Sequence, residues 1–267
     1  MTDLSGSPEV AEVTDELLIE RADGVVTVTF NAPARMNAFS FAMYQGLHDL
    51  CDSLAADESV KVLVLRGAGG RAFAAGNQIS DFLSRDAVEY EGWLQALFAK
   101  IQRLPQVSIA VIDGVCVGGG LAVATHCDLR LATPSSRFGY PIGRTLGNAL
   151  SSGVLYRCAA IFGEALTREM LLAARLVGAD RAYAVGALAY VGPAVEEEVA
   201  SIIASVQVMS GVTIGHTKTQ LARLVDQFEG APEDEDAALR EIYTGPDFNE
   251  GVRAFLAKEK PAFPSRG

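Results

Sequence analysis

The pattern of apolar and polar positions near the N-terminus predicts a hairpin followed by a helix. Leu17–Glu20 and Val25–Phe30 have compositions that favour strands, and they flank Asp23-Gly24, a dipeptide typical of hairpin turns. Ser40 has the side-chain type that caps helix N-termini, so we expect a helix from there to about Ala56.

Apolar strands and helix-like segments then alternate from residue 60 to residue 132. The expected strands are Val60–Arg66, Val107–Ile112 and Asp128–Ala132, the expected helices are Asp86–Arg103 and Gly118–His126, and Gly67–Ile79 is expected to be a loop. This alternation is typical of a parallel sheet with crossover helices, so the predicted fold class is α/β.

From about residue 149 onward the sequence is almost entirely helical in pattern. The expected helices are 149–162, 167–174, 180–186, 196–209, 213–228, 235–243 and 247–259. No linker or internal repeat divides the chain. We therefore expect a flexible tail over residues 1–14, an α/β core over 15–193 and a helical C-terminal subdomain over 194–267.

Composition and charge exclude several classes of function. Of the 267 residues, 49% are hydrophobic and 21% are charged, as in ordinary globular proteins. The net charge of −11 argues against nucleic acid as a partner, although a local basic cluster could still bind a small anion. The sequence has no run of 18 apolar residues, so we expect no membrane span, and residues 1–14 lack the apolar core of a secretion signal. A cytoplasmic location is the expectation.

Cysteine and histidine usage predicts neither a disulfide framework nor a metal site. Four cysteines in a chain of this length, with no C-x-x-C pair, do not make a disulfide framework, which is typical of reducing compartments. His126, Cys127 and Asp128 are contiguous, but their side chains diverge on a helix or a strand, so they do not make a ligand set.

Two glycine-containing stretches are the best candidates for chemistry. Gly118, Gly119 and Gly120 begin an apolar helical segment just behind a strand, where free N–H groups and the helix dipole favour negative charge such as a developing oxyanion. Phe73–Ile79 also follows a strand and contains small residues. Each stretch alone could be a tight turn, whereas the two together predict a pair of converging N–H donors.

A dinucleotide site is a weaker interpretation. Gly67–Ala72 fits the loose pattern G-x-G-x-x-A, but the helix that the pattern requires does not follow it directly.

With these motifs the chain resembles the crotonase (enoyl-CoA hydratase/isomerase) superfamily from about Leu17 to Phe263. Five ordered segments carry the resemblance: Asn31–Ala38, Ala75–Gln78, the Gly118–Gly120 stretch with Cys127–Ala132, Phe138–Pro141, and Asp247–Leu256 with Lys258–Pro261.

The resemblance implies a crotonase-like ββα spiral core that binds acyl-CoA, with a C-terminal subdomain that forms a homotrimer or a dimer of trimers. It implies that the thioester carbonyl lies between the backbone N–H groups of Asn77 and Gly119, which stabilise an enolate. Coenzyme A is then part of the substrate and no cofactor is permanently bound. The positions matched to CoA binding are Arg35, Ala38, Ala75, Gln78, Ile79 and Lys258, although Arg35 and Lys258 could instead be ordinary exposed charges.

The chain departs from the family pattern where family hydratases have two catalytic glutamates. These positions are Ala122 and Ile142, or Gly143 if the gap is placed differently, and the usual aspartate after the Ala-Gly-x segment is Gln78. None of these side chains can transfer a proton, so a standard two-glutamate hydration is not expected.

Other side chains could substitute for the missing glutamates. Tyr140, Asn148 and Ser151 lie in the stretch that faces the acyl group in the family, and Arg144 could bind a carboxylate on the substrate. The remaining base candidates are Asp81, Asp86 and Glu89, for each of which solvent exposure is the alternative. His126 is expected to be a structural histidine at a helix end.

Three functions remain open from the sequence. The first is an enoyl-CoA hydratase/isomerase-like enzyme in which other groups transfer the proton. The second is a crotonase-like decarboxylase or thioester hydrolase, which tolerates the loss of both glutamates. The third is a non-catalytic acyl-CoA-binding protein, against which the costly glycines argue.

Overall fold

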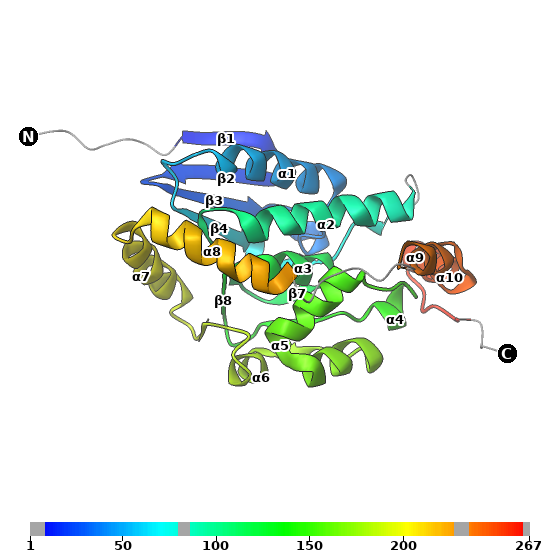
Figure 1. Cartoon of the computed structure of the whole chain (residues 1–267). Coiled ribbons are helices and arrows are strands. Elements are labelled where there is room, and N and C mark those ends of the chain that lie inside the picture. The colour runs from blue at the N-terminus through cyan, green and yellow to red at the C-terminus, as the bar shows by residue number, and fades with distance from the viewer. Residues whose placement is uncertain (1–8, 80–85, 227–234, 264–267) are drawn as a thin grey trace, which may run out of the picture.

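The computed structural model describes residues 9–79, 86–226 and 235–263, and Figure 1 shows the strands with helices packed against them. The larger sheet has seven strands, in the spatial order β1 (Glu9–Thr14), β2 (Leu17–Ala22), β3 (Val25–Phe30), β4 (Val62–Gly67), β6 (Val107–Ile112), β8 (Leu129–Ala132) and β11 (Tyr190–Val191). The smaller sheet has four, in the order β10 (Val177–Gly178), β9 (Arg137–Gly139), β7 (Val115–Val117) and β5 (Ala72–Ala75).

Three successive turns of chain build both sheets together. In each turn, one strand of the larger sheet is followed by one strand of the smaller sheet and then by helix. The turns are β4, β5 and α2 (Ala87–Arg103); β6, β7 and α3 (Gly119–His126); and β8, β9, α4 (Ile142–Thr145) and α5 (Ser152–Leu172). Equivalent strands of successive turns pair in parallel: β4 with β6 and β6 with β8 in the larger sheet, and β5 with β7 and β7 with β9 in the smaller one. The expected α/β fold with a ββα spiral core is therefore confirmed.

The sequence placed most elements of the first half correctly. The β2–β3 hairpin is antiparallel around Asp23 and Gly24, and the Ser40 side chain caps α1 (Phe41–Ala55) by accepting from the N–H of Met43. The expected strand Val107–Ile112 matches β6 in full.

Some expectations for local structure were wrong. Residues 9–14, expected to lie within a flexible tail, form β1, which pairs with β2. The expected loop Gly67–Ile79 contains the 3-10 turn η2 (Ala68–Gly70) and β5. Another 3-10 turn, η1 (Pro33–Arg35), precedes α1. The helices expected at 149–162 and 167–174 are one element, α5, broken at Gly163, where φ is +76°.

Both faces of the larger sheet are buried, because alternate residues of β4 pack in opposite directions. Leu63 and Leu65 join the core beneath α1, α2 and α3, whereas Val62 and Val64 join a second cluster with α7 (Val195–Gln207). α6 (Ala179–Ala184) leads into β11, and the chain ends in α8 (Gly211–Asp226), α9 (Glu235–Thr244) and α10 (Pro246–Ala257). Figure 1 shows α9 and α10 side by side near the end of the molecule where α4 lies.

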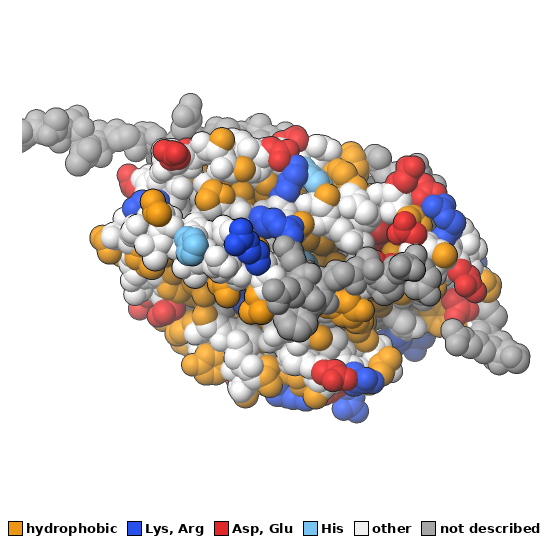
Figure 2. All heavy atoms as spheres, in the orientation of Figure 1, with side chains coloured by type: hydrophobic (Ala, Val, Ile, Leu, Met, Phe, Trp, Pro, Cys, Tyr) orange, Lys and Arg blue, Asp and Glu red, His pale blue; other side chains and the backbone are white. Residues whose placement is uncertain are grey.

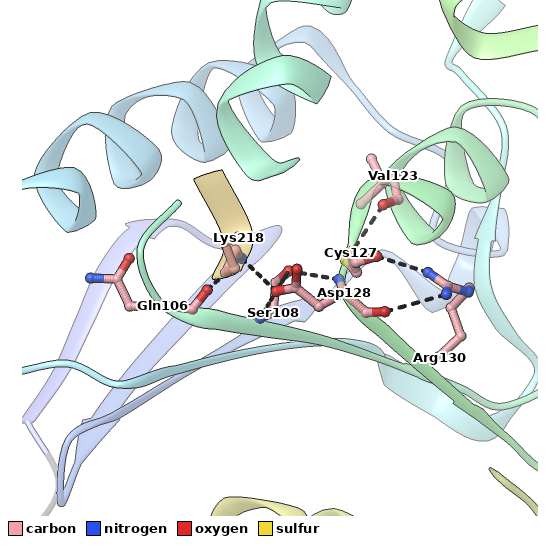
Figure 3. Close-up of polar contacts among 7 residues, drawn as sticks. All are labelled: Gln106, Ser108, Val123, Cys127, Asp128, Arg130 and Lys218. Atoms are coloured by element: carbon pink, nitrogen blue, oxygen red, sulfur yellow. Dashed lines mark hydrogen bonds and ion pairs between the residues drawn. The ribbon is translucent and has the colours of Figure 1, made fainter. Parts of the chain in front are cut away.

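A buried ion pair ties α8 to the sheet (Figure 3). The ammonium group of Lys218 contacts Asp128 Oδ2 and donates to the backbone carbonyl of Gln106 at 2.7 Å. The same Asp128 oxygen accepts from the N–H and the hydroxyl of Ser108, at 2.7 and 2.8 Å. The Lys218 side chain is only 7% exposed, so these contacts replace its hydration.

The surface carries acidic, basic and apolar side chains together. On the face shown in Figure 2, acidic and basic side chains are interspersed with apolar ones. Among the described residues no single helix is long and apolar enough to cross a membrane, although α7 and α8, bent by 109°, reach the required length and composition together.

Candidate active site

A cavity of about 550 Å³ lies between the spiral core and the C-terminal helices. Its volume is within the range of small-molecule sites in proteins. The wall is formed by the C-terminal ends of β5 and β7, the start of α3, one face of α2, the segment from Tyr140 to Ser151, and Phe255 of α10. The two glycine-containing stretches and the segment expected to face the acyl group therefore meet at one cavity.

The N–H groups of Asn77 and Gly119 both belong to residues that line this cavity. Phe39 donates to the carbonyl of Gly76 and accepts from the N–H of Gln78, so the intervening N–H of Asn77 faces away from Phe39. Gly119 is the first residue of α3, where an N–H has no intrahelical acceptor. Within the described part of the chain, neither N–H donates to a main-chain carbonyl.

The backbone at this point requires glycine for two reasons. Gly118 has φ +55° and ψ −129°, a conformation that residues with a Cβ rarely adopt. A Cβ on Gly119 would overlap Asn77 Oδ1 and the hydroxyl of Tyr44. That hydroxyl donates to Asn77 Oδ1 at 2.7 Å and so fixes the asparagine side chain above Gly119.

The positions matched to CoA binding are mostly brought together. Arg35, Ala38, Ala75, Gln78 and Ile79 all line the cavity. The Arg35 guanidinium lies 2.6 Å from Glu16 Oε1 and donates to the carbonyl of Ala38. This guanidinium holds the pKa of the Glu16 carboxyl below its usual value. Lys258 caps α10, one turn beyond Phe255, and is not among the lining residues.

Some of the expected side-chain catalysts line the cavity and others do not. Tyr140, Asn148 and Ser151 line the cavity, and burial raises the pKa of Tyr140 well above its usual value. Within the described residues, Asn148 Oδ1 and Ser151 Oγ are buried without a hydrogen-bond partner, so each can bind a polar group of a ligand. Arg144 is exposed on α4 and does not line the cavity.

The acidic candidates before and at the start of α2 are not at the cavity wall either. The Asp86 carboxylate accepts from the N–H groups of Val88 and Glu89 as the N-cap of α2, and it pairs with Arg240 at 3.0 Å. These bonds hold its pKa below the usual value. Glu89 is exposed and does not line the cavity. Asp81 lies outside the described residues.

The residues at the two family glutamate positions face the cavity without an ionisable group. Ala122 and Ile142 line it, as does Gln78, whereas Gly143 is exposed. His126 does not line the cavity. Its Nδ1 lies 2.7 Å from the carbonyl of Ala122, and burial lowers its pKa to about 3, so it is a neutral structural histidine as expected.

One carboxyl group that sequence analysis did not select lies at the cavity wall. Glu91 is on the same face of α2 as Leu94 and Phe98, and all three line the cavity. Its Oε1 accepts from the hydroxyl of Tyr243 at 2.6 Å. The signal in the sequence was a glutamate three residues before Leu94, inside an otherwise apolar stripe of the helix.

The described residues contain no group of three or more His, Cys, Asp or Glu side chains that could hold a metal ion. The four cysteines are buried and unpaired.

Known proteins match the chain over almost its whole length. A sequence model of the Enoyl-CoA hydratase/isomerase family matches residues 20–266. The 2,3-dehydroadipyl-CoA hydratase of Escherichia coli is 30% identical over 257 residues, which cover 94% of this chain and 99% of that protein.

Solved structures share the fold over almost the whole chain. An enoyl-CoA hydratase/carnithine racemase from Magnetospirillum magneticum is 33% identical, with a TM-score of 0.75 over 95% of this chain and 97% of that one. A methylmalonyl-CoA decarboxylase complexed with 2S-carboxypropyl-CoA is 25% identical, with a TM-score of 0.85 over 95% of this chain and 99% of that one.

Proposed function

The chain belongs to the enoyl-CoA hydratase/isomerase family, and we propose that it stabilises the enolate of an acyl-CoA thioester between the N–H groups of Asn77 and Gly119. It is an acyl-CoA-processing enzyme of the hydratase/isomerase kind. The observation that carries the proposal is that Asn77 and Gly119, from separate turns of the spiral, line one cavity, and that their N–H groups have no main-chain acceptor among the described residues.

Two fixed donors suit this chemistry because negative charge grows on the thioester oxygen when the neighbouring carbon loses a proton. Backbone dipoles that are already in place stabilise that charge without reorganising. The start of α3 adds the positive end of a helix dipole at Gly119. The N–H groups therefore lower the barrier to enolate formation more than they strengthen substrate binding.

The rest of the substrate would extend toward Arg35. CoA carries phosphates, and the Arg35 guanidinium at the cavity wall supplies a positive charge in an acidic protein. The acyl chain would occupy the apolar part of the cavity, beside Ala122, Ile142 and Leu94. No permanently bound cofactor is part of this proposal.

We also propose that the helical C-terminal subdomain, residues 194–267, joins copies of the chain in a trimer or a dimer of trimers. Large apolar side chains at the α7–α8 junction are exposed, among them Val208 at 87% and Val212 at 85%. Exposed apolar clusters of this kind are typical of protein interfaces. Sedimentation of the purified protein would measure the number of copies.

Decarboxylation is the second candidate. It needs a stabilised enolate but no strong base, which suits the uncharged Ala122 and Ile142, and the methylmalonyl-CoA decarboxylase has a similar fold. Against it, the Arg144 guanidinium expected to bind a substrate carboxylate is exposed and does not line the cavity.

The experiment that tests the proposal follows turnover of a panel of CoA esters. The panel contains a 2-enoyl-CoA, a 3-enoyl-CoA and methylmalonyl-CoA, with enoyl absorbance and CO₂ release as readouts. Gly119→Ala should reduce turnover by about 10²-fold or more, because its Cβ would overlap Asn77 and Tyr44 and displace the donor.

Gly92→Ala is the matched control, since a Cβ at this exposed helical position meets nothing within 4 Å. Equal turnover by Gly119→Ala and Gly92→Ala would overturn the assignment of the Gly119 donor. CO₂ release without double-bond chemistry would favour the decarboxylase. Tight binding of CoA esters with no turnover would favour a binding protein.

A further inference from the structure

We propose that Glu91 is the acid–base group that exchanges a proton with the carbon next to the thioester carbonyl. This inference rests on the proposed function, because it takes the thioester to be held by the N–H groups of Asn77 and Gly119. It assigns the proton transfer to a position on α2, away from the two positions where family hydratases have glutamates.

The ionisable residues of the cavity wall support Glu91 as the acid–base group, because the other two are unsuited to the role. Among the described residues that line the cavity, the ionisable ones are Arg35, Glu91 and Tyr140. Arg35 is permanently charged and pairs with Glu16. Burial raises the pKa of Tyr140 well above 10, so it stays protonated and cannot act as a base at neutral pH. Glu91 therefore supplies the one carboxyl group that these described lining residues offer.

The orientation of the carboxyl group also fits this role. The hydroxyl of Tyr243, on α9, donates to Oε1 at 2.6 Å, and Asn148 Nδ2 donates to that hydroxyl at 3.3 Å. Oε2 has no hydrogen-bond partner in the described part of the chain and is not among the fully buried polar atoms. One oxygen is thus fixed, and the other is available at the cavity.

The contacts around α9 keep this arrangement in place. Arg240, one turn before Tyr243, forms an ion pair with Asp86 at the start of α2. At the other end of α9, Glu235 accepts from the backbone N–H of Ser152 on α5. Two contacts N-terminal to Tyr243 therefore fix its helix, one to the start of α2 and one to α5.

The charged and titratable groups that face Glu91 leave it close to half-ionised at neutral pH. Its pKa is raised to about 7, because burial and the negative charge of Glu235 raise it more than the hydrogen bond from Tyr243 lowers it. Tyr44, on α1, also faces this carboxyl and stays neutral because burial raises its own pKa. A general acid–base group is most effective when its pKa is near the working pH.

The proposed step balances without any other reactant. The Glu91 carboxylate takes the proton from the α-carbon, and the electron pair of the broken C–H bond becomes the enolate, whose oxygen accepts from Asn77 and Gly119. The neutral carboxylic acid then returns a proton, either to the same carbon or, in a substrate with a conjugated enolate, to the γ-carbon. The carboxylate is restored in both cases.

The test measures exchange of the α-protons of butyryl-CoA in D₂O by NMR, with the full-length protein. This saturated ester has no double bond to hydrate, so exchange reports enolate formation alone. We compare wild type, Glu91→Gln and Glu241→Gln, the last being an exposed glutamate on α9. Glutamine keeps the size of Glu91 and an oxygen for the Tyr243 hydroxyl, so the fold should be retained.

We expect Glu91→Gln to exchange at least 10²-fold more slowly than wild type while its Kd for butyryl-CoA, from calorimetry, changes less than about threefold. Wild-type exchange should rise with pH through about 7, and this dependence should vanish in Glu91→Gln. Glu241→Gln should behave as wild type.

Equal exchange by wild type and Glu91→Gln would overturn the role of Glu91 and leave the proposed function intact. Absence of exchange in wild type, together with no turnover of enoyl-CoA, would overturn the proposed function itself. A Glu91→Gln variant that loses exchange and binding in parallel would show a structural role, which also overturns the inference.

Discussion

The hydroxyl of Tyr243 lies 2.6 Å from Oε1 of Glu91, and this hydrogen bond joins residues that are 152 positions apart in the chain. It connects α9 of the C-terminal subdomain to the wall of the cavity in the spiral core. A residue outside the core therefore lowers the proton affinity of the carboxyl group at the cavity, which burial raises.

Replacing Tyr243 with phenylalanine should raise the pKa of Glu91 above its value of about 7. The tyrosine hydroxyl donates to the carboxylate and so favours the ionised form, which phenylalanine cannot do. The pH profile of α-proton exchange should shift toward higher pH, with a slower rate at neutral pH. A profile unchanged from that of wild type would contradict the coupling between the two side chains. Tyr183→Phe, at an exposed tyrosine, is the matched control.

Glu91 should also make the stability of the protein depend on pH. Its pKa is about 7 in the folded protein and near 4.5 without burial, so the folded state binds more protons than the unfolded state between these values. The stabilising contribution is complete below about pH 4.5 and is lost as the pH rises through about 7. In urea unfolding, wild type should lose about 3 kcal/mol relative to Glu91→Gln between pH 4.5 and pH 8. Parallel pH curves for the two proteins would show that this carboxyl is not buried as described.

Replacing Tyr44 with phenylalanine should reduce kcat/KM by about tenfold, or about 1.4 kcal/mol. The hydroxyl that donates to Asn77 Oδ1 at 2.7 Å is removed, so the side chain of Asn77 above Gly119 is no longer fixed. The measurement is turnover of the best substrate in the CoA-ester panel. The result expected of a purely structural tyrosine is a lower Tm with kcat/KM unchanged.

An enzyme with a single carboxyl group at the cavity should isomerise a double bond of the substrate faster than it hydrates one. Hydration requires one group to activate water and a proton to be delivered to carbon, whereas a double-bond shift needs only one group that takes and returns a proton. We expect conversion of a 3-enoyl-CoA to its 2-enoyl isomer to exceed hydration of the 2-enoyl-CoA by about tenfold or more. Both rates can be followed by enoyl absorbance in one assay, and faster hydration would point to a second acid–base group.

Breaking the ion pair between Asp128 and Lys218 should destabilise the protein without touching the cavity. Asp128→Ala leaves a buried ammonium group with the carbonyl of Gln106 as its remaining partner among the contacts drawn in Figure 3, and we expect a loss of about 3 kcal/mol. Asp52→Ala breaks an exposed pair with Lys100 and should cost less than about 1 kcal/mol. Urea unfolding of both variants makes the comparison. Equal losses would mean that burial of Lys218 adds nothing.

The sequence predicted the fold well where periodicity and capping agree. Val107–Ile112 is a run of apolar and β-branched residues, and Ser40 is followed by an amphipathic helix, so local preference and tertiary packing favour the same structure. Ala72–Ala75 has little intrinsic preference for a strand, and pairing with β7 fixes it there. The residues of this segment alone do not predict that pairing.

The candidate site was predictable in its backbone and less so in its side chains. The glycines at 118–120 are required by conformation and close approach, which leaves a signal in the sequence. Arg144 is only four residues after Tyr140, yet the turn of α4 directs it to the surface. Local sequence does not single out Glu91, because its environment depends on Tyr243, which is distant in the chain, and on Asn148, which donates to Tyr243.

The docking of α9 and the protonation of Glu91 at the cavity are thermodynamically linked, so each changes the free energy of the other by the same amount. α9 acts on Glu91 in two opposite ways: the Tyr243 hydroxyl favours the ionised carboxyl, and the negative charge of Glu235 disfavours it. Whatever net change α9 makes to the free energy of ionising Glu91, ionisation of Glu91 makes the same change to the free energy of docking α9. Any neighbour that displaces α9 would change the acidity of the cavity without entering it.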